Sequence, residues 1–277
     1  MSSSPILDNK DPDSPSVFEP AALLREARRQ KGLPIADVPS VCILDPDGDI
    51  VRRLKSAGKA KRSEAWPCYH TELYDFELAG ETVGIVGCAV GAPFAVLVAE
   101  ELFASGCRIL VSLTSAGQIV PAGKLPYFVV IDRALRDEGT SYHYAAPDAF
   151  AEADTNLVTT AVRALQNAGL QVYVGPSWTT DAPFRETATA VAVARARGVL
   201  AVEMEAAALY TFSRKRNKPV LCLAHVTNTM GLADRDFEKG EASGTADALV
   251  ILEALTRGLH SSACEESHAR ERALDVI

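Results

Sequence analysis

Residues 198–208 read Gly-Val-Leu-Ala-Val-Glu-Met-Glu-Ala-Ala-Ala and join a strand-like apolar run to a helix-like pattern. The run ends at Val202, and two carboxylates, Glu203 and Glu205, then flank Met204. A glutamate near a helix N-terminus is favourable through the helix dipole, which accounts for one of the two. A carboxylate that leaves an apolar run beside a pocket also suits a ligand with paired hydroxyls, because it accepts two hydrogen bonds while it stays charged.

The same alternation of apolar runs and helical patterns extends along the chain on both sides. Continuous apolar runs are typical of strands buried on both faces, and they lie at residues 40–44, 108–114, 126–131, 170–174 and 219–226. Residues 72–78 alternate, and Ala79-Gly80-Glu81 predicts a hairpin turn into a strand at 82–86. Helices are predicted at residues 20–31, 93–104, from a cap at Asp154 or Thr155 to before Gly169, 186–197, 203–216 and 245–256. This order predicts an α/β fold with a central mixed β-sheet flanked by helices.

The expected organisation is one domain, residues 19–258, between two ends of different composition. No linker interrupts residues 35–258. Residues 1–18 are rich in Ser, Pro and Asp and have little periodicity, which predicts a flexible arm. Residues 259–277 carry charge and Ser with a weak apolar pattern, and we expect a tail there that is loosely helical or disordered.

Composition excludes several classes of protein. The 277 residues are 48% hydrophobic and carry a formal net charge of −8, so the chain can close a core but is a poor non-specific binder of nucleic acid. No apolar stretch reaches the ~18–20 residues that span a bilayer. The six cysteines form no CxxC pair and the five histidines lack metal-pair spacing. We therefore expect a cytoplasmic protein that binds no metal, no nucleic acid and no membrane.

Two further polar clusters follow predicted strands. Residues 112–117 (Ser-Leu-Thr-Ser-Ala-Gly) end a buried run, where ligands of α/β sheets bind, and their small side chains let a ligand approach the backbone. Residues 136–144 mix both charges with two tyrosines and a histidine, a composition that suggests a pocket wall. A tight turn and a solvated loop are the plain alternatives. Dinucleotide, P-loop, zinc-protease and serine-hydrolase motifs are absent from the sequence.

Taken in order, these clusters resemble the nucleoside phosphorylase-I superfamily, which includes uridine phosphorylase, hexameric purine nucleoside phosphorylase and the methylthioadenosine/S-adenosylhomocysteine nucleosidases. The resemblance covers roughly residues 38–256 and is most specific at Val202-Glu203-Met204-Glu205-Ala206. Residues 136–144 look most like the uridine phosphorylase branch. Residues 180–184 resemble the segment that places an aromatic against the base, and Gly91-Ala92-Pro93 resembles the turn before the first long helix.

The resemblance implies a role for each residue of the central motif. Glu205 would accept hydrogen bonds from the ribose 2′ and 3′ hydroxyls, Met204 would pack under the sugar, and Glu203 would line the same pocket as a further ribose-binding residue. Asn228 would donate a hydrogen bond to the base. Glu205 and Asn228 are therefore the expected catalytic residues.

The resemblance also implies contacts to the base and to the nucleophile. Phe184 would lie against the base, with Arg185 as a further base contact. Ser115 would contact phosphate or ribose, and Gly117 would keep the loop tight.

Two arginines of the family's phosphate site are replaced in this chain. Ser112 stands three residues before Ser115, where phosphorylases place an arginine. The family's Gly-Asp-Pro-x-Arg loop appears here as residues 44–48, Leu-Asp-Pro-Asp-Gly. A phosphate dianion would then need other cations or backbone N–H groups. Arg136, or Arg62 reaching a neighbouring subunit, are the candidates.

The implied activity is cleavage of the N-glycosidic bond of a uridine or purine nucleoside by phosphorolysis, with inorganic phosphate as co-substrate and no other cofactor. Asn228 favours this reading, because nucleosidases place there an aspartate that protonates the purine, and asparagine is no general acid. Hydrolysis is the alternative, since Ser115-Ala116-Gly117 also resembles the nucleosidases. A third possibility is a nucleoside-binding protein without catalysis. The resemblance further implies a homo-oligomer, dimer to hexamer.

Overall fold

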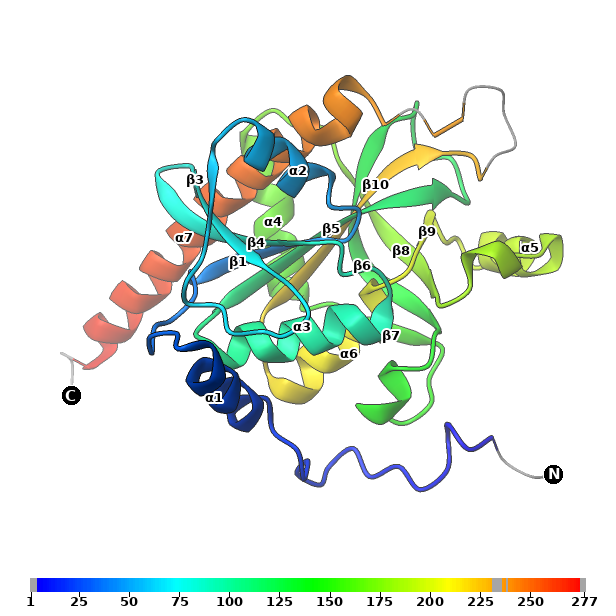
Figure 1. The fold of residues 1–277 in the computed structure, drawn as a ribbon. Helices are drawn as coiled ribbons and strands as arrows, with labels where there is room; N and C mark the ends of the chain where they lie inside the picture. Colours follow the sequence, from blue (N-terminus) through cyan, green and yellow to red (C-terminus); the bar gives the residue numbers. More distant parts are fainter. Residues whose placement is uncertain (1–3, 231–235, 238, 275–277) are drawn as a thin grey trace.

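A sheet of ten strands runs through the described part of the molecule (Figure 1). The computed structural model describes residues 4–230, 236–237 and 239–274, with side chains as far as residue 259. The strands are β1 (Val41–Asp45), β2 (Ala60–Arg62), β3 (Leu73–Leu78), β4 (Glu81–Gly87), β5 (Ile109–Gln118), β6 (Tyr127–Asp137), β7 (Phe150–Glu152), β8 (Tyr173–Thr180), β9 (Ala201–Glu203) and β10 (Val220–Asn228). Their order is β10-β6-β8-β9-β5-β1-β4-β3-β2, with β7 on β6.

The sheet closes partly on itself, because β5 pairs with both β9 and β10. Strands β5, β10, β6, β8 and β9 therefore form a ring of hydrogen-bonded neighbours. The open wing beyond β5 is parallel in β1 and β4 and ends in the antiparallel strands β3 and β2. The carboxyl ends of β1, β5 and β10 meet at one edge, since these three strands are parallel.

Helices cover both faces of the sheet (Figure 1). On one face α3 (Ala92–Ala104) packs on α1 (Pro20–Lys31) and α6 (Ala206–Arg216), over a core that includes Leu102, Leu209 and Phe212. On the other face α7 (Thr245–Leu274) contacts α2 (Asp49–Ser56) and α4 (Thr155–Asn167), over Ile43, Ile85 and Leu221. The nine-residue helix α5 (Ala188–Ala196) lies apart from the others, beside the ends of β8 and β9 (Figure 1).

The predicted fold class is confirmed: the chain is an α/β protein with a central mixed sheet flanked by helices. The first helix has the predicted bounds, and β3 and β4 form the predicted hairpin. Asp154 caps α4, where its carboxylate accepts the N–H groups of Asn156 and Leu157. Amphipathic spacing and capping residues thus placed these elements correctly.

Several elements have other bounds than expected, among them β5 and β6, which run on to Gln118 and Asp137. The strand expected at 170–174 runs from Tyr173 to Thr180, because its hydrogen bonds to β6 extend into polar residues that an apolar pattern misses. The helix expected from 203 begins at Ala206, since Glu203 ends β9. The helix expected at 186–197 is α5, capped by Thr187. The last helix continues to Leu274, so helical backbone covers most of the expected tail.

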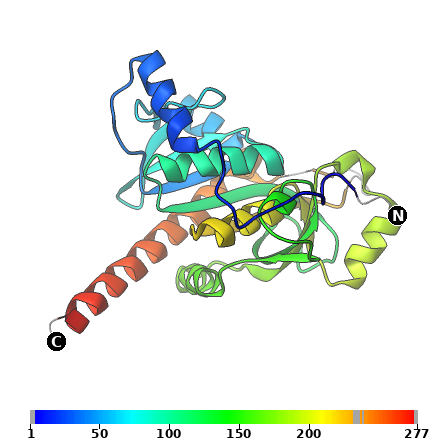
Figure 2. The same ribbon diagram turned by 90° about the horizontal axis from the view of Figure 1, so that it is seen from below.

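The N-terminal residues 4–18 form turns and no helix or strand, and they lie along one side of the molecule (Figure 2). Asp13 pairs with Lys215 at 2.5 Å, and Ser16 accepts a hydrogen bond from Arg216 at 3.4 Å. Both partners belong to the last turn of α6. The arm is therefore placed against the domain, whereas its flexibility stays a prediction. Within the described residues no helix is long and apolar enough to cross a membrane.

Candidate active site

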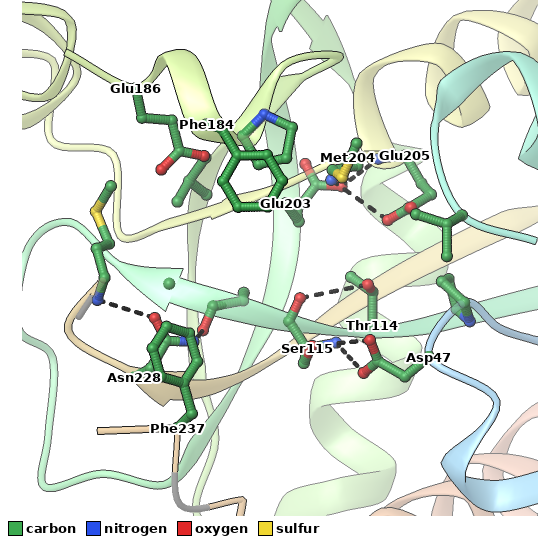
Figure 3. Close-up of a pocket in the computed structure, with 17 residues that line it drawn as sticks. Asp47, Thr114, Ser115, Phe184, Glu186, Glu203, Met204, Glu205, Asn228 and Phe237 are labelled. Carbon is green, nitrogen blue, oxygen red and sulfur yellow. Dashed lines mark hydrogen bonds between the residues drawn. The ribbon is translucent and has the colours of Figure 1, made fainter. Parts of the chain in front are cut away.

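A pocket of about 380 Å³ opens where β1, β5 and β10 end (Figure 3). The turn after β1, the residues after β9 and the loop between β8 and α5 complete its walls. Seven residues predicted for the site line it: Ser115, Gly117, Phe184, Glu203, Met204, Glu205 and Asn228. The fold thus brings together segments that lie more than 100 positions apart in the sequence.

Glu205 places a buried carboxyl group in the wall of this pocket. Its side chain is 1% exposed, and Oε1 accepts the N–H of Gly91 at 2.8 Å. Burial and, second, the neighbouring carboxylate of Glu203 together raise the pKa of Glu205 to about 8. Gly91 belongs to the predicted turn before α3, so this bond fixes the position of the carboxyl group across the pocket floor.

Glu203 lines the same pocket, but protein groups fill its hydrogen-bonding capacity. Oε1 accepts the hydroxyls of Ser177 at 2.9 Å and Thr179 at 2.5 Å. Oε2 accepts the N–H groups of Glu205 and Ala206, both at 2.7 Å. Glu203 therefore caps α6 and holds the turn that presents Glu205. Its predicted contact with ribose stays a prediction.

The floor of the pocket is formed by the ends of β5 and β10. Asn228 is buried, donates from Nδ2 to the carbonyl of Ala116 at 3.3 Å and accepts the N–H of Met230 at 2.9 Å. A Cβ on Gly117 would lie 3.0 Å from Met230 Cγ and 3.1 Å from Val202 Cγ1. The close approach of β9 and of Met230, which follows β10, explains why residue 117 carries no side chain.

The outer wall carries aromatic side chains that are exposed. Phe184 lies in a short 3₁₀ turn (Pro183–Arg185) and is 99% exposed, and Phe237 is 61% exposed (Figure 3). Beside Phe184, burial raises the pKa of Glu186 to about 6. Arg185, the predicted further base contact, is exposed and does not line the pocket.

Comparison with known proteins identifies the family. Residues 21–257 match the model of the phosphorylase superfamily. The chain belongs to the phosphorylase superfamily. This confirms the family predicted from the motif at residues 202–206.

Relatives within the phosphorylase superfamily are distant in sequence. Uridine phosphorylase from Thermococcus kodakarensis is 25% identical over 236 residues, which are 78% of this chain and 83% of that protein. A DeoD-type purine nucleoside phosphorylase from Shewanella denitrificans is 27% identical over 175 residues, 62% of this chain and 74% of that one. The solved uridine phosphorylase from Vibrio fischeri shares the fold, with a TM-score of 0.67, 22% identity and coverage of 81% and 92%.

This member of the phosphorylase superfamily lacks an arginine at the two positions where the sequence comparison expected one. Ser112 is buried, and its Oγ has no hydrogen-bond partner among the described residues. Gly48 adopts a positive φ of 73°, and a Cβ there would lie 2.5 Å from Cys88 Sγ. The local backbone therefore excludes a large side chain at residue 48.

The two arginines proposed as substitutes lie outside the pocket. Arg62 is exposed in β2 at the far edge of the sheet and pairs with Glu72 at 3.3 Å. Arg136 is buried and donates to Ser141 Oγ at 2.8 Å and to the carbonyl of Ala146 at 2.7 Å. Arg136 and Tyr144 line a separate cavity, and none of residues 136–144 lines the main pocket, so the predicted pocket wall is not part of this site. A contact of Arg62 with a neighbouring subunit stays a prediction.

Two charged residues beside Ser115, Asp47 and Lys239, were not predicted from the sequence. Asp47 accepts the N–H of Ser115 at 3.1 Å and its hydroxyl at 3.0 Å. Lys239 contacts Asp47 at 3.2 Å and Asp49 at 2.7 Å. Asp47 had a usable signal, because it follows β1, the parallel neighbour of β5. Lys239 had none, since it lies 192 positions from Asp47 in a segment without a motif.

The raised pKa of Glu205 predicts that the free energy of unfolding decreases as the pH rises. The folded protein keeps a proton on Glu205 between the ordinary pKa of 4.5 and about 8, whereas the unfolded chain releases it. Stabilisation from this group is therefore complete below pH 4.5 and is lost as pH rises through about 8. We expect Glu205→Gln, which cannot titrate, to lose less stability over this range, by at least the ~1.4 kcal/mol of one pKa unit. Urea unfolding of both proteins at about pH 5 and about pH 8.5 measures this, and equal losses would contradict it.

Proposed function

We propose that this protein cleaves the N-glycosidic bond of a nucleoside by phosphorolysis, which yields the free base and ribose 1-phosphate. One observation carries the proposal: a buried carboxyl group, Glu205, lies in the wall of a pocket that also holds Ser115 and the exposed ring of Phe184. Membership of the phosphorylase superfamily supports it, as do relatives named uridine phosphorylase and purine nucleoside phosphorylase. The co-substrate is inorganic phosphate, and the reaction uses no metal or organic cofactor.

The chemistry follows from the arrangement of these groups. A phosphate oxygen forms a bond to C1′ of the sugar while the bond from C1′ to the base nitrogen breaks, and the base leaves with the electron pair. Positive charge develops on the sugar and negative charge on the base. Glu205 holds the ribose through its 2′ and 3′ hydroxyls, and Asn228 donates a hydrogen bond to the base. Rigid placement of the sugar against the nucleophile supplies much of the rate.

Phe184 supports a stacking contact with the base. Its ring is 99% exposed on the pocket rim, so removing it costs the folded chain almost no packing. Base–aromatic stacking is worth about 1–3 kcal/mol, and we therefore expect Phe184→Ala to raise KM for the nucleoside about tenfold. Steady-state kinetics measure the change, and thermal unfolding serves as the control because Tm should stay the same. An unchanged KM would remove Phe184 from the base site.

A panel of nucleosides tests the proposal and finds the base class. Uridine, inosine, guanosine and adenosine are incubated with the protein and inorganic phosphate, and the free base is measured by chromatography. We expect at least one base to be released, in a reaction that requires phosphate. No release from any nucleoside, with or without phosphate, would contradict the proposed function.

Hydrolysis is the second candidate, and one observation favours it. The donors of Ser115 are taken by the carboxylate of Asp47, and the positions of two phosphate-binding arginines hold Ser112 and Gly48. In hydrolysis a water oxygen bonds to C1′ while the bond from C1′ to the base nitrogen breaks and the nucleobase leaves with the electron pair. The proton of the water passes to a general base such as a carboxylate. Release of free ribose in phosphate-free buffer would identify this reaction in place of phosphorolysis.

We also propose that the protein acts as a homo-oligomer in the cytoplasm. The exposed Phe184 and Val90 on the pocket rim support a second copy that closes the site. The five cysteines whose side chains are described are free thiols, which supports a reducing compartment. Light scattering after size-exclusion chromatography measures the assembly, and a monomer at working concentration would contradict it.

A further inference from the structure

We propose that Asp47 is a built-in anion that occupies the phosphate position and sets the affinity of this site for phosphate. The inference rests on the proposed phosphorolysis and assigns to Asp47 a role that the sequence comparison did not foresee. In this proposal phosphate binds only when the carboxylate of Asp47 leaves its donors.

The donors around Asp47 form an oxyanion site. Ser115 donates its N–H to Oδ2 at 3.1 Å and its hydroxyl to Oδ1 at 3.0 Å, so it contacts both oxygens (Figure 3). The ammonium group of Lys239 lies 3.2 Å from Oδ2. A backbone N–H, a hydroxyl and a cation around two oxygens match what a phosphate group needs. Ser115 is also the residue that the family resemblance assigns to phosphate or ribose.

Asp47 can leave this position, whereas its neighbours are held. Its side chain is 31% exposed, and it faces the pocket. Asp45, two residues earlier, is 2% exposed and accepts the N–H of Val51 at 2.9 Å. Lys239 keeps a second partner, Asp49 at 2.7 Å, and so stays in place when Asp47 turns away. Rotation of one side chain therefore frees Ser115 and Lys239 together.

The charges around this position make the affinity for phosphate depend on whether phosphate can replace the carboxylate of Asp47. Asp45, Asp47 and Asp49 surround the position, with Lys239 and Arg52 as the nearby cations. A phosphate dianion that entered beside an unmoved Asp47 would meet a like charge at contact distance. Without the two arginines that the family resemblance implies, the site discriminates against phosphate as long as Asp47 remains. The wild-type protein should accordingly show a high KM for phosphate.

The test compares the KM for phosphate of the wild type with that of Asp47→Ala and Asp47→Asn. Loss of a charge-assisted competitor should lower this KM about tenfold in Asp47→Ala. Asp47→Asn keeps the shape of the side chain but loses its charge, so its KM for phosphate should lie between those of the wild type and Asp47→Ala. Asp148→Ala, which removes one exposed carboxylate far from the pocket, is the matched control for net charge and should not change the KM. Lys239→Met should raise it.

Binding measured without turnover separates failure of this inference from failure of the proposed function. Isothermal titration with inorganic phosphate should give tighter binding to Asp47→Ala than to the wild type, even if no nucleoside is cleaved. Equal affinity of the wild type, Asp47→Ala and Asp148→Ala would overturn the inference. So would free ribose from the wild type that disappears in Asp47→Asn, because Asp47 would then act on water.

Discussion

Glu205→Gln is expected to lower kcat/KM for a ribonucleoside by about 100-fold or more. At a pH above about 8, where the carboxyl group of Glu205 is ionised, the ribose 2′ and 3′ hydroxyls each lose a charge-assisted hydrogen bond worth about 1.5–3 kcal/mol, and about 1.4 kcal/mol corresponds to a tenfold change. Glutamine keeps the acceptor for the N–H of Gly91, so the pocket wall should keep its shape. Initial rates at several nucleoside concentrations, with phosphate held constant, give the value.

A matched substrate distinguishes a ribose contact from a general loss of the fold. The same variant is compared on a 2′-deoxynucleoside, which lacks one of the two hydroxyls. If Glu205 binds the diol, the loss on the deoxy substrate should be smaller by about tenfold, because one of the two hydrogen bonds was already missing. Equal losses on both substrates would argue that Glu205 does not contact the 2′ hydroxyl.

Glu203→Ala is expected to lower the free energy of unfolding by about 3–5 kcal/mol. Its carboxylate is the acceptor for two hydroxyls and two N–H groups in a buried site, and alanine leaves these donors without a partner. Burial raises the pKa of Glu203, but four donors hold the charged form in place. The turn before α6 loses its cap, so activity should fall with stability. Urea denaturation measures the change.

Glutamine at the same position provides the control. Its amide oxygen can accept the N–H groups of Glu205 and Ala206, while its NH₂ donates to the hydroxyls of Ser177 and Thr179, which can rotate to accept. Glu203→Gln should therefore be destabilised by only about 1 kcal/mol. If alanine and glutamine destabilise equally, the charge and not the hydrogen-bond network is what matters, and the assignment of Glu203 as a cap is wrong.

Local patterns in the sequence predicted most of the elements but not how distant strands pair. The amphipathic spacing of residues 20–31 and the cap at Asp154 define their helices, because helix formation depends on neighbours in sequence. The pairing of β5 with β10, more than 100 residues apart, leaves no local trace. The polar residues at the end of β8 were also not predicted as part of a strand. They are buried because β8 pairs with its neighbours there, and a hydrophobic pattern does not mark them.

Site residues could be predicted from the sequence where a side chain of suitable chemistry directly follows a predicted strand. Glu205 follows an apolar run directly, and the structure places its carboxyl group in the pocket wall. The sequence does not show, however, which group a charged side chain contacts. Arg136 carries the charge expected for phosphate, yet the carbonyl groups and a hydroxyl of its own loop hold its guanidinium. The Asp47–Lys239 pair, formed across 192 positions, could be seen only once the chain was folded.

Product analysis of the wild type beside Glu205→Gln tests the central claim most directly. Each protein is incubated above about pH 8, where Glu205 is ionised, with the best nucleoside of the panel and inorganic phosphate. Ribose 1-phosphate is followed by phosphorus NMR, and the free base is measured by chromatography. The account predicts equal amounts of base and ribose 1-phosphate from the wild type, and about 100-fold slower formation of both by Glu205→Gln. Base released without ribose 1-phosphate, or equal rates for the two proteins, would contradict it.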